Sequence, residues 1–131
     1  MNKDSQILSR CFEQLADTDT DIAPAVYARF TTAMPEALQH IGYLDERMKG
    51  RMLDQVYQLL LGETDDNYLA FEAEMHKGYG ANTALYRGLL SAVRDTVKDA
   101  LAASWSAQED AAWDASINRI VGDIERLDAT H

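Results

Sequence analysis

Apolar residues recur every three or four positions along almost the whole chain, and only two prolines interrupt its 131 residues. This period places apolar side chains on one face of an α-helix, whereas a β-strand needs alternation at every second position. No alternation persists over the length of a strand, and the seven glycines leave room for long helices. The sequence therefore predicts an all-α protein, folded as a single domain over residues 1–131.

Local start and stop signals divide the chain into six or seven expected helices. Asp4 or Ser5 is placed to cap the first helix, and Pro24 suits the first turn of the second. Pro35 forces the chain to change direction after the second helix. Gly62 ends the long helix that directly precedes it in the sequence. The expected helices span about 5–15, 21–34, 36–40, 45–61, 68–75, 83–101 and 106–128.

Net charge and composition exclude several classes of partner. The formal charge is −10, with 22 acidic against 12 basic residues, which disfavours nucleic acids and anionic membranes because both bind clustered Lys and Arg. No segment approaches the roughly 20 apolar residues of a membrane span, and the N-terminus lacks a secretion signal. We therefore expect a cytoplasmic protein. The single cysteine, Cys11, lies on an apolar helix face and is expected in the core.

Three groups of residues follow one another in the order of a known family. They are the stretch Tyr27-Ala28-Arg29-Phe30 that leads to Pro35-Glu36, then His76 before a glycine corner at 78–80 with Tyr86 ten residues on, and finally Ala112-Trp113 followed by Ile117, Ile120 and Val121. Together they resemble the globin family, in particular single-domain bacterial globins and the haem domain of flavohaemoglobins. The resemblance spans nearly the whole chain and implies a globin-like fold of six to seven helices.

The resemblance also implies a cofactor and its ligands. The cofactor is haem b, with His76 as the proximal ligand of its iron and Tyr27 as the distal donor to bound dioxygen. The distal position on the third long helix is Met48, or Lys49 if the alignment shifts by one. Ile41 or Tyr43 stands where the family has a phenylalanine. The residues expected around the haem, besides Tyr27, are Phe30, Ile41, Met48, Lys49, Met52, Val56, Met75 and Tyr86.

The function implied is reversible binding of dioxygen, and of other diatomic gases such as nitric oxide and carbon monoxide. Flavohaemoglobin-like conversion of nitric oxide to nitrate is an extension that needs an external reductase, because no flavin or nicotinamide module follows the helices. We therefore do not expect an enzyme in its own right, and the protein is expected as a monomer or homodimer. No HExxH, paired-cysteine, phosphate-loop or EF-hand pattern offers another site.

A second hypothesis explains the same residues without haem. A histidine at a helix end is more commonly a surface or capping residue than a ligand, and a lone tyrosine on an apolar stripe is more commonly a core residue. The missing phenylalanine and the apolar distal helix also suit a globin-shaped sensory or protein-interaction module. In that case His76 is structural and Tyr27 is satisfied by a backbone carbonyl.

Overall fold

The computed structural model describes residues 3–19, 21–42, 45–62 and 83–130, and every regular element within them is helical. The expectation of an all-α protein is therefore confirmed for this part of the chain. Two short 3₁₀ turns, Pro35–Ala37 and Ala102–Ser104, join longer helices. The α-helices are α1 Lys3–Asp17, α2 Ala23–Ala33, α3 Leu38–Ile41, α4 Glu46–Leu61, α6 Thr83–Ala100 and α7 Ala107–Thr130.

Most predicted helix ends are observed, with side chains that satisfy the first or last backbone groups. The Asp45 carboxylate accepts a hydrogen bond from the Met48 amide (2.8 Å), and Gly62 ends α4 with a left-handed φ of 72°. Before α7, the Ser106 amide donates to the Glu109 carboxylate at 2.9 Å. The first helix differs, because it already includes Asp4 and Ser5, so neither residue caps it.

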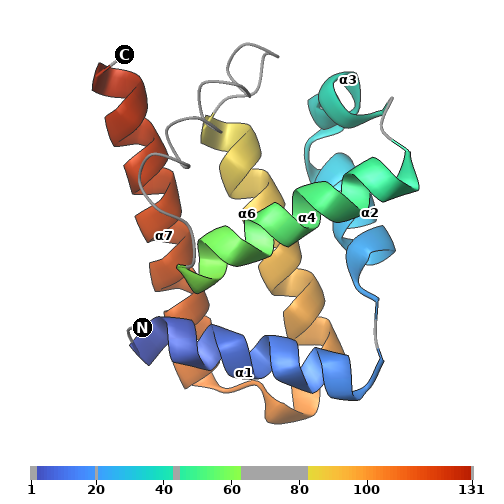
Figure 1. The fold of residues 1–131 in the computed structure, drawn as a ribbon, viewed down its shortest axis with the longest axis vertical. Coiled ribbons are helices and arrows are strands. Elements are labelled where there is room, and N and C mark those ends of the chain that lie inside the picture. Colours follow the sequence, from blue (N-terminus) through green and yellow to red (C-terminus); the bar gives the residue numbers. More distant parts are fainter. Residues whose placement is uncertain (1–2, 20, 43–44, 63–82, 131) are drawn as a thin grey trace.

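The helices cross in two main directions (Figure 1). In that view α1 and α4 run across the molecule, while α6 and α7 run along its long axis. Helix α2 packs against α6 and α4, and α1 packs against α7, α4 and α6. Helix α7 also contacts α4 and α6. Residues far apart in the sequence therefore share one core, as a single domain requires.

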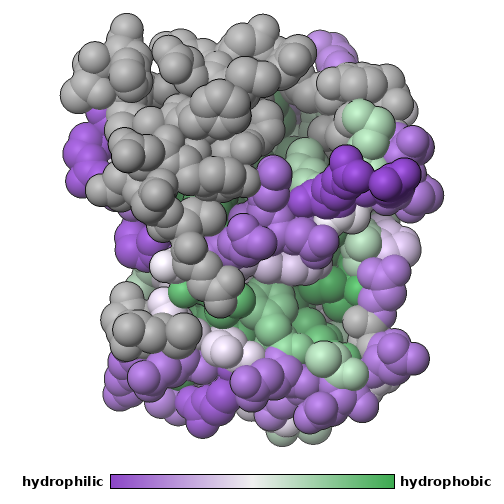
Figure 2. All heavy atoms as spheres, in the orientation of Figure 1, coloured by the Kyte–Doolittle hydropathy of each residue, from purple (hydrophilic) through white to green (hydrophobic). Residues whose placement is uncertain are grey.

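The apolar stripes predicted from the sequence form this core. Cys11 and Trp113 are 3% and 0% exposed, and burial raises the pKa of the Cys11 thiol. The Phe12 ring lies 4.9 Å from the ring of Tyr57 and 5.7 Å from that of Trp113. Figure 2 shows apolar side chains gathered between the polar outer surfaces of α1 and α4. Met48 departs from its stripe, because it lies in the exposed first turn of α4 and is 46% exposed.

Helices α2 and α6 come close enough to need a glycine. A β-carbon on Gly88 would overlap the sulfur of Met34, and it would lie 3.4 Å from the Phe30 ring. Gly88 lies inside α6, where alanine would favour helix formation more than glycine does. The glycine is therefore explained by packing, because a residue without a side chain lets the two helices approach closely. The sequence alone gave no sign of this crossing point.

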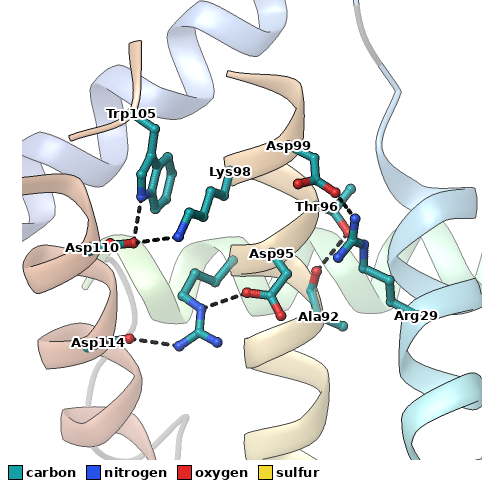
Figure 3. Close-up of polar contacts among 10 residues, drawn as sticks. Arg29, Ala92, Asp95, Thr96, Lys98, Asp99, Trp105, Asp110 and Asp114 are labelled. Carbon is teal, nitrogen blue, oxygen red and sulfur yellow. Dashed lines mark hydrogen bonds and ion pairs between the residues drawn. The ribbon is translucent and has the colours of Figure 1, made fainter. Parts of the chain in front are cut away.

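Polar side chains join the outer parts of α6, α7 and α2 (Figure 3). Arg94 of α6 bonds Asp95 at 3.0 Å and reaches across to Asp114 of α7 at 2.7 Å. The Arg29 guanidinium of α2 pairs with Asp99 of α6. These links lie at the surface, so we expect each to contribute modestly. Within the described ranges, no helix is both long and apolar enough to cross a membrane.

Candidate functional site

Tyr27 and Lys49 form the centre of the candidate site, where α2 meets α4. The Tyr27 hydroxyl donates a hydrogen bond to the Lys49 backbone carbonyl at 2.9 Å. The Lys49 ammonium lies 5.5 Å from the centroid of the Tyr27 ring, within cation–π range. Tyr27 is 7% exposed, so its ring is part of the core while its hydroxyl faces the backbone of α4.

Burial determines the protonation state of Tyr27. Desolvation is the largest cause that raises the pKa of this phenol above its ordinary value, with smaller contributions from Tyr57 and Glu46. Tyr57 behaves in the same way, and burial raises its pKa to about 12. Because the charged form of a buried phenol is disfavoured, Tyr27 keeps its proton at neutral pH. Tyr27 is therefore a hydrogen-bond donor, as the predicted distal role requires.

A pocket of about 310 Å³ opens beside this pair. Pro24 and Ala28 of α2 and Leu38 of α3 give it an apolar side. Glu46 and Lys49 give it a charged side, with the Lys49 ammonium 3.9 Å from a Glu46 carboxylate oxygen. This volume is at the lower end of the roughly 300–1,000 Å³ typical of small-molecule sites. The pocket therefore suits a small ligand with one charged end.

The structure also describes other residues that were predicted to surround the haem, and these lie on α2, α4 and α6. Phe30 and Val56 are core residues, 4% and 9% exposed. Met52 and Tyr86 are partly buried and pack against that core. Met48 is nearly half exposed, so of the two distal alternatives it is Lys49 whose backbone contacts Tyr27. The structure thus brings Tyr27 and Lys49 together directly.

Three of the predicted site residues cannot be placed. His76, the predicted iron ligand, and Met75 lie outside the described residues. Ile41 ends α3, but its side chain is also outside the described part. Among the residues that are described, no three His, Cys, Asp or Glu side chains gather as a metal site would require. The predicted site residues whose side chains the structure describes are Tyr27, Phe30, Met48, Lys49, Met52, Val56 and Tyr86.

The chemistry of the described groups fits the distal face of a haem. Phe30 and Val56 are buried and Met52 is partly buried, so their aromatic, aliphatic and thioether groups give this side of the interior the apolar character that a porphyrin needs. Tyr27 adds a single protonated hydroxyl. This hydroxyl already has an acceptor in the Lys49 carbonyl, so donation to a distal ligand requires it to exchange one acceptor for the other.

Sequence reasoning did not find the pocket, and although the second hypothesis gave Tyr27 a backbone carbonyl as acceptor, it did not identify Lys49. A backbone carbonyl leaves no mark in a sequence, so the bond to Lys49 depends on the angle at which α2 crosses α4. The pocket has a weak signal in the sequence, because Glu46 and Lys49 are three residues apart at the start of a helix and so share a face. That spacing was compatible with an ordinary solvated surface.

No known protein-family model matches the chain, and no characterised protein is significantly similar to it in sequence.

Proposed function

We propose that this chain is a globin-like protein that binds haem b and reversibly binds dioxygen, and by the same chemistry nitric oxide and carbon monoxide. The observation that carries the proposal is the burial of Tyr27 against α4, at the position that the resemblance assigns to the distal tyrosine. The all-helical architecture of the described residues and the order of the Tyr27, His76 and Tyr86 motifs support it.

In this proposal each residue has a distinct role. His76 holds the iron through one ring nitrogen, and haem supplies the centre at which a diatomic gas binds. Tyr27 donates its phenolic hydrogen toward the gas from the distal side. Phe30, Met52 and Val56 exclude water, so this hydrogen bond acts in a medium of low dielectric. Turnover of nitric oxide to nitrate would additionally require an external reductase as partner.

Absorption spectroscopy tests the cofactor. Protein expressed with haem available should show a strong Soret band that shifts when carbon monoxide is added. His76→Ala should lose the band, and His40→Ala is the matched control, because it removes another of the three histidines and should keep the band. A colourless wild-type protein, or a band that survives His76→Ala unchanged, contradicts the proposal.

The distal role of Tyr27 has its own measurement. A hydrogen bond in a dry pocket is worth about 1–3 kcal/mol, so Tyr27→Phe should release dioxygen roughly tenfold to a hundredfold faster. Tyr57→Phe is the control. It also removes a phenolic hydroxyl, but from a tyrosine whose ring packs on Phe12. Equal off-rates in Tyr27→Phe and the wild type would remove Tyr27 from the distal role.

One observation favours the haem-free alternative, a globin-like sensory or interaction module. The Tyr27 hydroxyl is satisfied by the Lys49 carbonyl, as expected of a tyrosine that only joins two helices. In this alternative the purified protein is colourless, folds without haem and unfolds at the same temperature when haem is added. A rise in unfolding temperature with haem supports the first proposal instead, because a ligand that binds the folded state stabilises it.

A further inference from the structure

The ammonium of Lys49 has hydrogen-bonding capacity to spare. Three N–H groups belong to it, and within the described residues none has an acceptor within hydrogen-bonding distance. Its only charged neighbour there is Glu46, at 3.9 Å, whose side chain is 88% exposed. The Lys49 side chain is 25% exposed, and its ammonium is not among the buried polar atoms that lack a partner, so it is accessible to water and to a dissolved ligand. An ammonium without an acceptor among the described residues is available to bind an anion.

The position of this ammonium is fixed by the surrounding fold. Its α4 backbone is bonded to the Tyr27 hydroxyl, and its charge lies over the Tyr27 ring. Asp45 caps the same helical turn through the Met48 amide. The backbone contacts fix where the Lys49 side chain begins, and the contact with the Tyr27 ring holds its ammonium at the edge of the 310 Å³ pocket.

The opposite side of the pocket is apolar. Pro24, Ala28 and Leu38 line it, and Leu38 is 56% exposed although it is a large hydrophobic residue. Covering such a side chain with an apolar group removes its surface from water. The pocket thus places a cation and an apolar wall within the reach of one small molecule.

We propose that this pocket binds a small carboxylate with an apolar body. Lys49 donates to the carboxylate, and the apolar body lies against Leu38 and the Tyr27 ring. Glu46 is a competitor for the same ammonium, and its long, exposed contact is readily displaced. The proposal shares Tyr27 and Lys49 with the predicted haem site, but it does not depend on haem and stands whether or not the proposed function is correct.

Titration with benzoate tests the site in the full-length protein. We expect saturable binding with a dissociation constant on the order of 1 mM, as suits so small a ligand. Benzamide has the same shape without the charge and should bind at least about tenfold more weakly. Calorimetry gives the constants, and amide chemical shifts of Thr31, Gly42 and Glu46 should report the location, because these residues line the pocket.

Three variants assign the binding to Lys49. Lys49→Met keeps the apolar stem and should weaken benzoate binding at least about tenfold, since a charge-assisted hydrogen bond is lost. Lys98→Met, which removes an α6 lysine that pairs with Asp110 of α7, should bind as the wild type does. Glu46→Gln should bind severalfold more tightly, because the competing carboxylate is gone. Thermal unfolding checks that each variant is folded.

The outcomes that overturn the proposal are specific. They are no saturable binding of benzoate, equal binding of benzamide and benzoate, or unchanged binding in a folded Lys49→Met variant. Repeating the titration on haem-loaded protein separates two sources of carboxylate. If benzoate still binds the haem-loaded protein, the pocket takes a free carboxylate. If benzoate binds the haem-free protein but not the haem-loaded one, a haem propionate occupies Lys49.

Discussion

The hydroxyl of Tyr27 and the backbone carbonyl of Lys49 are joined by a 2.9 Å hydrogen bond that ties α2 to α4. These residues are 22 positions apart in the sequence, and both belong to the predicted distal side of the site. The bond has two consequences. It fixes the wall of the pocket beside Lys49, and it gives Tyr27 a structural role that is separate from any contact with a gas.

Loss of the Tyr27 hydroxyl should therefore destabilise the protein even without haem. A buried hydrogen bond contributes about 0.5–1.5 kcal/mol, so Tyr27→Phe should lower the free energy of unfolding by about 1 kcal/mol. Urea denaturation followed by circular dichroism measures this change. Tyr57→Phe is the control and should be nearly neutral, because no hydrogen bond of the Tyr57 hydroxyl is seen to a described residue. Equal losses in the two variants would argue against the α2–α4 tie.

Two glycines inside helices should respond to alanine in opposite directions. Alanine at Gly88 overlaps Met34 and should cost about 1 kcal/mol, because overpacking exceeds the gain in helix propensity. Gly122 lies in α7 with nothing within 4 Å of an added β-carbon, so Gly122→Ala should stabilise by about 0.5–1 kcal/mol. Unfolding temperatures decide the signs. Stabilisation by both substitutions would show that Met34 yields its space at no cost.

Arg94 should matter more than a basic residue paired within one helix. The Arg94 side chain is 28% exposed and joins α6 to Asp114 of α7, whereas among the described residues Arg126 pairs only with Asp123 of its own helix. We expect Arg94→Met to cost about 1 kcal/mol and Arg126→Met less than about 0.5 kcal/mol. Salt should reduce the difference, because screening weakens exposed pairs. A salt-independent difference would point to packing of the Arg94 stem instead.

The carboxylate of Asp110 should titrate below its ordinary range. The hydrogen bond from the Trp105 indole, at 2.6 Å, is the largest cause that lowers the pKa of Asp110, followed by burial in the opposite direction and then by Lys98. A depressed folded-state pKa adds stability above the unfolded pKa, and this stability is lost as pH falls through the folded value. The contribution therefore disappears in acid, below the ordinary pKa of 3.8.

Trp105→Phe isolates this effect. It removes the indole donor and keeps an aromatic ring, so the pKa of Asp110 should rise towards 3.8. A carboxyl-detected NMR titration of the wild type and the variant measures the pKa directly. Lys98→Met should cause a smaller rise, since Lys98 is a lesser cause of the shift. A larger rise in Lys98→Met than in Trp105→Phe would reverse the assignment.

The sequence predicted the parts of the fold that depend on local patterns. The start of α4 was predicted near position 45, and Gly62 was identified as its end because a left-handed helix terminus favours glycine. Cys11 and Trp113 were placed in the core by helical periodicity, and both are buried. The first helix began earlier than predicted because Asp4 and Ser5 fit its first turn as well as its cap.

Features that depend on how helices cross could not be predicted. Nothing in the sequence shows that the Tyr27 hydroxyl donates to Lys49 in particular, or that Gly88 lies against Met34, the residue that follows α2. Met48 has the residue type of a core position, yet the first turn of α4 leaves it exposed. The assignment of His76 to iron rests on the resemblance and stays a prediction. Spacing along the chain defines helix faces, but which faces meet is determined by three-dimensional packing.

The C-terminal end of α4 is held by two parts of the molecule. Gly62 turns its amide back to the carbonyls of Gln58 and Leu59, and the Arg119 guanidinium of α7 reaches the same Leu59 carbonyl at 3.2 Å. The C-terminal end of α4, which precedes position 76 in the sequence, is therefore held in place. A substitution at Arg119, more than forty residues downstream of that histidine, should loosen this helix end and, under the proposed function, weaken haem retention from a distance.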